Sequence, residues 1–180
     1  ISGTLTAAAH TFELNGRQVS GTSAGRLYLP IFARDTGTVQ SALPFFLPPE
    51  FMRTAVEAFL ASQEHFGADP ATAGAVSAVV DATGRYDKAT VVSDEETSVV
   101  LAARAHYDAF GGVDWLLSEV DGQSVLDRLG AALDYLRRAR RWGETELIFR
   151  GHTTDWGDVK REPGPEPTDL ADGNDLTISP

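Results

Sequence analysis

The densest group of residues that could do chemistry is residues 151–159, which read GHTTDWGDV. Asp155 and Asp158 lie on either side of Trp156, with His152 just before them. Two carboxylates in one site can differ in pKa, because an apolar wall such as an indole keeps one protonated as a general acid while the other stays ionised. The stretch therefore predicts a site for general acid chemistry, with His152 as a substrate contact. The alternative is that both aspartates only cap and pack a loop.

A second candidate is the adjacent pair Arg34 and Asp35, where a strand-like run meets a predicted helix. A guanidinium donates strong charge-assisted hydrogen bonds and a carboxylate accepts them, so the pair could hold two neighbouring hydroxyls of a ligand. The alternative is a local salt bridge, with Asp35 or Thr36 capping the helix.

The third candidate is the acidic run that begins at Asp94. We expect Asp94 to open a helix, with its side chain accepting from the amide of Thr97, and Glu95 and Glu96 to be favourable in the first helical turn. This capping interpretation competes with a role for Asp94 in binding substrate. His106, later on the same predicted helix, is interpreted as a core or interface residue rather than a catalyst.

Other chemistries lack their sequence signatures. The chain has no cysteine, which excludes disulfides and thiolate metal sites. It has no Gly-x-Ser-x-Gly elbow, phosphate-binding loop or dinucleotide fingerprint, and the acidic residues 169–175 do not match a calcium loop. We therefore expect no metal and no cofactor. Carboxylates and aromatic rings are what a sugar site uses, so an oligosaccharide or glycoside is the expected ligand.

Most of the chain that would position these residues is predicted to be helical, after a short β segment. Asn15 and Gly16 between alternating runs predict a tight hairpin, because a type I′ turn needs positive φ at both positions. Apolar spacing predicts the helices, and short β-branched runs predict the remaining strands. The predicted helices are 36–42, 50–63, 94–110, 113–120 and 123–141, and the predicted strands are 26–32, 76–80 and 146–150.

The composition is that of a globular domain, with 42% hydrophobic and 23% charged residues among 180. A net charge of -11 argues against nucleic-acid binding, since contact with phosphates needs clustered cations. The arginines of residues 137–141 are interpreted as complementing a helix C-terminus. No apolar run reaches the roughly 18 residues that a membrane span needs, so no membrane partner is expected. Neither compartment nor oligomeric state is indicated.

Several motifs, taken in their order along the chain, resemble the six-hairpin glycosidase superfamily. They are FARDTG at 32–37, YD at 86–87, SDEET at 93–97, LDYL at 133–136 and TDWGD at 154–158. The resemblance implies an (α/α)6 toroid of helical hairpins, with the sugar site at the end where the loops converge. It also implies that the first residues belong to the tail of an N-terminal β-domain.

The resemblance also implies roles for individual residues. The run DWGD is similar to the Asp-Trp-Asn-Asp run of the cellobiose and chitobiose phosphorylases, whose second aspartate is the general acid. By resemblance Asp158 is therefore the general acid, Asp155 its partner or a hydroxyl acceptor, and Trp156 the wall of a sugar subsite. Gly157 replaces the asparagine of that run, which argues against phosphorylase activity itself. Glycoside hydrolase is therefore the broader interpretation.

The pair Arg34 and Asp35 is similar to the Arg-Asp pair with which the same phosphorylases hold the hydroxyls of the sugar that does not react, and Asp94 is taken as a further substrate contact. Most members of the superfamily invert the anomeric configuration, using an acid and a base about 6.5–9.5 Å apart. The base usually lies later in the chain. We therefore expect this chain, taken alone, to lack activity.

The sequence thus predicts a mainly α fold. Residues 1–32 are expected to be a β-hairpin or linker segment, and residues 33–180 the truncated N-terminal part of an (α/α)6 catalytic domain, because a full toroid needs more helices than the sequence predicts. The expected function is that of an inverting glycoside hydrolase. The alternatives are a disaccharide phosphorylase and a non-catalytic carbohydrate-binding or structural helical domain.

Overall fold

The computed structural model describes residues 9–23, 29–86, 88, 94–141, 143–145, 147–151 and 176–179. The described part of the chain is mainly helical, and its strands form short antiparallel pairs, which confirms the mainly α prediction. In order, the elements are β1 (Ala9–Leu14), β2 (Arg17–Thr22), β3 (Ile31–Phe32), α2 (Ala33–Ala42), the 3-10 helix η1 (Pro44–Phe46), α3 (Pro49–Ala61), α4 (Gln63–Phe66), β4 (Val79–Val80), α5 (Glu95–Phe110), α6 (Val113–Leu117), β5 (Glu119–Val120), β6 (Gln123–Ser124), α7 (Val125–Ala139), β7 (Ile148–Gly151) and β8 (Leu176–Ser179).

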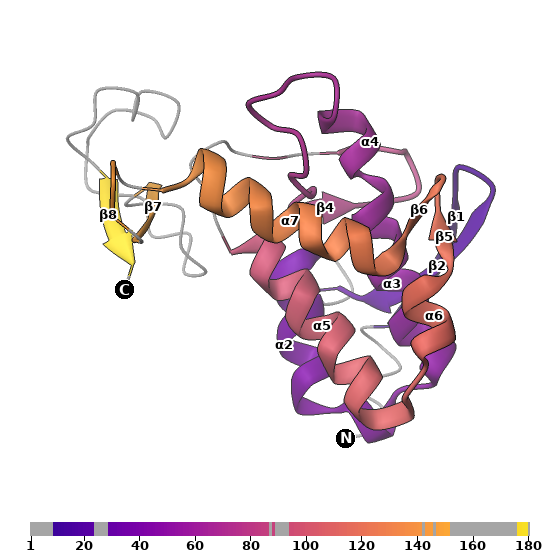
Figure 1. The fold of residues 1–180 in the computed structure, drawn as a ribbon. Helices are drawn as coiled ribbons and strands as arrows, with labels where there is room; N and C mark the ends of the chain where they lie inside the picture. The colour runs from indigo at the N-terminus through magenta and orange to yellow at the C-terminus, as the bar shows by residue number, and fades with distance from the viewer. Residues whose placement is uncertain are drawn as a thin grey trace, which may run out of the picture.

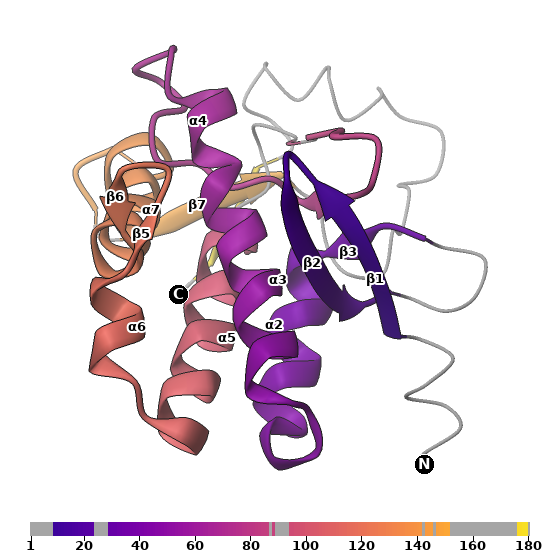
Figure 2. The same cartoon turned by 90° about the vertical axis from the view of Figure 1, so that its right-hand side faces the viewer.

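The predicted hairpin is confirmed in β1 and β2. Its turn residues have φ of 51° at Asn15 and 77° at Gly16, the left-handed values that a two-residue turn requires. Leu14 and Val19 point into the core, and the amide of Ser20 donates to the hydroxyl of Thr54 on α3 at 3.1 Å. The hairpin is therefore docked on α3 rather than extended away from the helices (Figure 2).

Helices α2, α3 and α5 lie side by side, as Figure 2 shows. Helix α3 begins at Pro49, where the missing amide hydrogen costs nothing, and it buries Met52, Val56, Phe59 and Leu60 at helical spacing. The six residues 43–48 between α2 and α3 are a short connection, which makes the two helices an antiparallel pair.

Helices α2 and α5 run parallel and approach each other closely. Gly37 on α2 lies so near α5 that an added Cβ would be 2.6 Å from the carbonyl oxygen of Ser98. Three residues earlier on α2, Arg34 contacts Asp94, the residue just before α5. Because the contacts advance in the same direction along both helices, the N-terminal ends of α2 and α5 lie at the same end of the pair.

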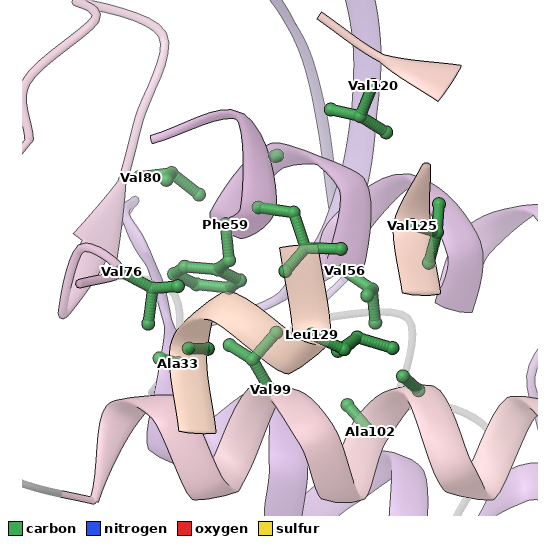
Figure 3. Close-up of a cluster of buried hydrophobic side chains, with 14 of the residues drawn as sticks. Ala33, Val56, Phe59, Val76, Val80, Val99, Ala102, Val120, Val125 and Leu129 are labelled. Atoms are coloured by element: carbon green, nitrogen blue, oxygen red, sulfur yellow. The ribbon is translucent and has the colours of Figure 1, made fainter. Parts of the chain in front are cut away.

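The core is formed where these helices meet α7. Figure 3 shows Val56 and Phe59 of α3, Val99 and Ala102 of α5, and Leu129 of α7 gathered in one cluster. All five are buried, four of them with 3% exposure or less. Val99 and Ala102 are three positions apart, so they share one face of α5.

Helix α7 crosses the others and leads from β6 to the strand pair β7–β8 (Figure 1). Ser124 caps it by accepting from the amide of Asp127 at 3.0 Å. Arg128 on α7 is only 1% exposed; it donates to the carbonyls of Val120 at 2.6 Å and Asp121 at 3.0 Å and pairs with Glu64 at 2.7 Å. This buried guanidinium ties α7 to α4 and to the β5–β6 turn.

Some local predictions were wrong. Helix α2 begins at Ala33 with Phe32 at the N-cap position, so neither Asp35 nor Thr36 caps it; instead the hydroxyl of Thr36 donates to the Phe32 carbonyl at 2.8 Å. The arginines predicted to complement the C-terminus of α7 follow that prediction only in part. Arg137 and Arg138 lie in the last turn as expected, whereas Arg140 is buried, and burial lowers its pKa.

The remaining boundaries differ from the predictions by a few residues. The predicted strands are observed as β3, β4 and β7, each at or near one end of its predicted range, and the short helix predicted over 113–120 ends at Leu117 and gives way to β5. Among the described residues, no helix has the length and apolar composition that crossing a membrane requires.

Candidate functional site

The N-terminal ends of α2 and α5 bring together the chemical groups of two predicted candidates. The guanidinium of Arg34 contacts both carboxylate oxygens of Asp94, with Nη2 to Oδ1 at 2.9 Å and a shorter contact from Nε to Oδ2. The exposed fractions of the two side chains are 25% and 31%. The contact is a bidentate, partly exposed ion pair that joins two helices from distant parts of the sequence.

This pair corrects the expectation for Asp94. The residue does occupy the N-cap position of α5, but its side chain makes no capping hydrogen bond and is directed to Arg34 instead. Its main-chain carbonyl accepts from the hydroxyl of Thr97 at 3.0 Å and from the amide of Ser98 at 2.9 Å. A carboxylate that is not used for capping is available to a ligand together with the guanidinium it binds.

Asp35 follows Arg34 on α2, is half-buried and feels the charge of Arg34. Burial raises the pKa of its carboxyl group above the ordinary value, although a hydrogen bond with its own main chain and the positive charge of Arg34 both lower it. A partly exposed carboxyl group with a raised pKa can accept a hydrogen bond from a hydroxyl group. When it is protonated, it can instead donate a hydrogen bond to an oxygen atom.

Directly behind Asp94 is a buried charge cluster of Lys88, Glu95 and Glu96. The Nζ atom of Lys88 lies 2.6 Å from Oε1 of Glu96 and 3.2 Å from Oε2 of Glu95, and the three side chains are exposed by 4% or less. Oε1 of Glu96 also accepts from the amide of Val76 at 3.1 Å. The cluster fixes the first turn of α5, and with it the position of Asp94.

The cluster has one lysine for two carboxylates, and the pKa values follow from that imbalance. Burial lowers the pKa of Lys88, but the attraction of Glu95 and Glu96 outweighs it, so the pKa of Lys88 is raised. The pKa of Glu95 is raised as well, first by burial and then by the charges of Glu96 and Asp94, against the lowering effect of Lys88. Lys88 and Glu95 therefore each hold a proton more tightly than the same group does in water.

Sequence reasoning missed Lys88 and misjudged Glu95 and Glu96, which were expected to be favourable only through the helix dipole. The signal for their burial was present, because Glu95 and Glu96 lie three or four residues before the buried Val99 and so share its face of the helix. Two buried carboxylates require a cation. Nothing in the helical pattern indicates that Lys88 supplies it, since Lys88 precedes the helix.

His106 has the role predicted for it. It is 5% exposed, and its ring centroid lies 4.4 Å from that of Trp115 and 5.5 Å from that of Phe110. Burial lowers its pKa, with a smaller contribution from the charge of Arg53. It is a core residue and is not directed into the candidate site.

The other predicted site residues, His152, Asp155, Trp156 and Asp158, lie outside the described residues. The described chain approaches them through β7, which ends at Gly151 and pairs in antiparallel register with β8. Their roles therefore stay predictions.

Within the described ranges, no group of three or more His, Cys, Asp or Glu side chains is arranged to hold a metal ion. The chemistry available at the N-terminal ends of α2 and α5 is that of hydrogen bonds and charge, from one guanidinium and its neighbouring carboxyl groups. Comparisons of the chain with protein-family models, with curated proteins and with solved structures found no match.

Proposed function

We propose that this chain is part of a glycoside hydrolase in which the N-terminal ends of α2 and α5 bind a sugar. The observation that carries the proposal is the bidentate, partly exposed pair of Arg34 and Asp94 beside Asp35. Each carboxylate oxygen can accept a second hydrogen bond, and the guanidinium has five N–H donors. The group can therefore donate to one sugar hydroxyl and accept from its neighbour, as the proposed binding of vicinal hydroxyls requires.

The arrangement of helices supports a partial (α/α)6 toroid. Parallel α2 and α5 would be neighbouring inner helices, and α3, antiparallel to α2, would be an outer one. An apolar groove of about 390 Å³ runs between α5, α6 and α7 and is lined by Val100, Tyr107, Leu116, Leu126 and Leu133, among others. A further helical hairpin packed there would bury this surface, as a continuing toroid requires.

The proposed chemistry is acid and base catalysis by two carboxyl groups. Asp158 would protonate the glycosidic oxygen as the bond to the anomeric carbon breaks, and a second carboxylate would take a proton from the water that attacks that carbon. Asp155 would orient the substrate, Trp156 would stack on a sugar ring and His152 would contact it. Arg34, Asp35 and Asp94 would bind hydroxyls and do no covalent chemistry.

The proposal can be tested in the protein that contains this chain, by measuring the release of reducing sugar from a panel of glycosides. Asp158→Asn should lower kcat about 10²- to 10⁴-fold, as loss of a general acid does. Arg34→Lys keeps the charge but loses the two-pronged geometry, so kcat/KM should fall about 10- to 100-fold, which is the value of a hydrogen bond to a charged group.

Arg137→Lys is the matched control, because Arg137 also lies near a carboxylate, that of Asp134 at 3.9 Å, but on the exposed surface of α7. It should leave kcat/KM unchanged. Unchanged turnover in Asp158→Asn would remove Asp158 from the acid role. Cleavage that depends on phosphate would favour the phosphorylase, and saccharide binding without turnover would favour a non-catalytic domain.

A further inference from the structure

A second cavity lies between the β1–β2 hairpin, the end of α3, α4 and the β5–β6 turn. Its volume is about 400 Å³, within the range of pockets that hold small molecules. It shares no lining residue with the group formed by Arg34, Asp35 and Asp94. The function proposed above does not use it.

The cavity has an apolar floor and an aromatic wall. Leu14, Val19 and Ala58 form the floor, and all three are buried. Tyr86 and His65 form the wall, with ring centroids 5.4 Å apart and planes tilted by 47°. Aromatic rings beside a polar rim suit a ligand with one C–H face and several hydroxyls.

The rim carries polar groups that are held in place by hydrogen bonds within the protein and still have donors and acceptors for further hydrogen bonds. The side-chain amide of Asn15 donates to the hydroxyl of Tyr86 at 3.2 Å, which leaves its carbonyl and a second N–H for other partners. Arg17 and Asp121 pair at 2.5 Å and connect the hairpin to the β5–β6 turn. Both side chains are more than one third exposed, so a ligand can reach them.

The charges select among ligands. Three carboxylates, those of Glu57, Glu64 and Asp121, line the cavity together with the guanidinium of Arg17. Each of the three carboxylates already has a cationic partner in the protein: Glu57 pairs with Arg53 at 3.5 Å, Glu64 with Arg128 at 2.7 Å and Asp121 with Arg17 at 2.5 Å. Three carboxylates are thus balanced by three guanidiniums, so neither a cationic nor an anionic ligand meets an unpaired charge among these groups, and a neutral polar ligand fits them best.

We propose that this cavity binds one sugar unit of a neutral saccharide, at a site separate from the ends of α2 and α5. The ring of the sugar lies against Tyr86 and His65, and its hydroxyls bond to Asn15 and to the pair of Arg17 and Asp121. The choice of a saccharide among neutral polyols rests on the proposed function. The position of the cavity and its preference for a neutral ligand do not.

The test is NMR titration of the isotopically labelled protein that contains this chain, with a neutral methyl glycoside, a neutral disaccharide and, as the anionic comparison, glucuronate. The expected result is saturable shifts at the amides of Gly16 and Gly122, which lie in the two turns at the rim, with the neutral ligands but not with glucuronate.

Two variants remove cavity groups without disturbing the fold. Asn15→Gly keeps the left-handed turn while removing the amide, and His65→Ala removes one exposed ring. Each should weaken binding about three- to tenfold, the value of one hydrogen bond or one aromatic contact. Arg34→Lys is the matched control and should leave the shifts at Gly16 and Gly122 unchanged. Thermal melting confirms that each variant is folded.

The outcomes separate this proposal from the proposed function. Shifts confined to the ends of α2 and α5 would overturn the cavity proposal and leave the glycosidase proposal standing. Shifts at the cavity in a protein without glycosidase activity would overturn the glycosidase proposal and leave the cavity proposal standing. Equal binding of glucuronate, or no shifts at Gly16 and Gly122 with any neutral ligand, would overturn the assignment of this cavity.

Discussion

The close approach of α2 and α5 predicts opposite results for two Gly→Ala substitutions in helices. At Gly37 on α2, an added Cβ would lie 2.6 Å from the carbonyl oxygen of Ser98 and 2.9 Å from its Cα. Both atoms belong to the main chain of α5, so no side-chain rotation relieves the contact. At Gly130 on α7, an added Cβ meets nothing within 4 Å.

The magnitudes follow from two opposing effects. Alanine is favoured over glycine in a helix interior by about 0.8–1.0 kcal/mol, and this gain applies to both positions. Forcing a methyl group into a packed contact costs about 1–3 kcal/mol, with the upper half expected where the main chain must move. Gly37→Ala should therefore lower the free energy of unfolding by about 1–2 kcal/mol, whereas Gly130→Ala should raise it by about 0.5–1 kcal/mol.

Urea unfolding followed by circular dichroism measures both values. For a chain of this size the melting temperature should fall by about 2–8 °C in Gly37→Ala and rise by about 1–4 °C in Gly130→Ala. A double-mutant cycle between Arg34→Gln and Asp94→Asn should also show weaker coupling in the Gly37→Ala background, because the two helices are pushed apart. If Gly37→Ala proves as stabilising as Gly130→Ala, the parallel close packing of α2 and α5 is wrong.

Two further predictions concern buried charges. Lys88→Met leaves Glu95 and Glu96 buried without a cation and should cost about 3–5 kcal/mol in urea unfolding. Because the pKa of Lys88 is raised in the folded protein, its charge contributes its full share of stability below pH 10.5, the ordinary pKa. That share is lost as the pH rises through the pKa of the folded state, and Lys88→Met should not show this alkaline loss of stability. The pKa of His106 is lowered from 6.5, so the unfolded state binds the proton first and stability should fall as the pH drops below about 6.5. His106→Phe should flatten that acid decline, and an unchanged decline would assign it to other groups.

The parts of the fold that the sequence could predict are those with local causes. Asn15 and Gly16 specify their turn by their own backbone preferences. Helix α3 follows from a proline at its start and from apolar residues at helical spacing, and Ser124 marks the beginning of α7 by capping it. In each case the decisive interaction joins residues within a few positions of one another.

The predictions that failed depended on partners far away in the chain. Asp94 was expected to cap its own helix, and a local pair with Asp35 was the alternative considered for Arg34. In the fold Arg34 finds Asp94 instead, 60 residues later. A carboxylate at an N-cap position can either cap its own helix or pair with a cation from a distant part of the chain. The local sequence indicates only the first of these. The choice was decided by packing, because Gly37 lets α5 come near enough for the longer-range pair to form.

The close contact at Gly37 therefore bears on the candidate site as well as on stability. One turn separates Gly37 from Arg34, so the spacing between the helix axes at Gly37 limits how far the guanidinium must reach to Asp94. The buried cluster of Lys88, Glu95 and Glu96 fixes the same turn of α5 from the other side. A group that binds ligands must be held in place before the ligand arrives, and here two independent contacts hold it. Loss of either contact should therefore weaken the sugar binding proposed for Arg34, although neither contact belongs to the proposed site.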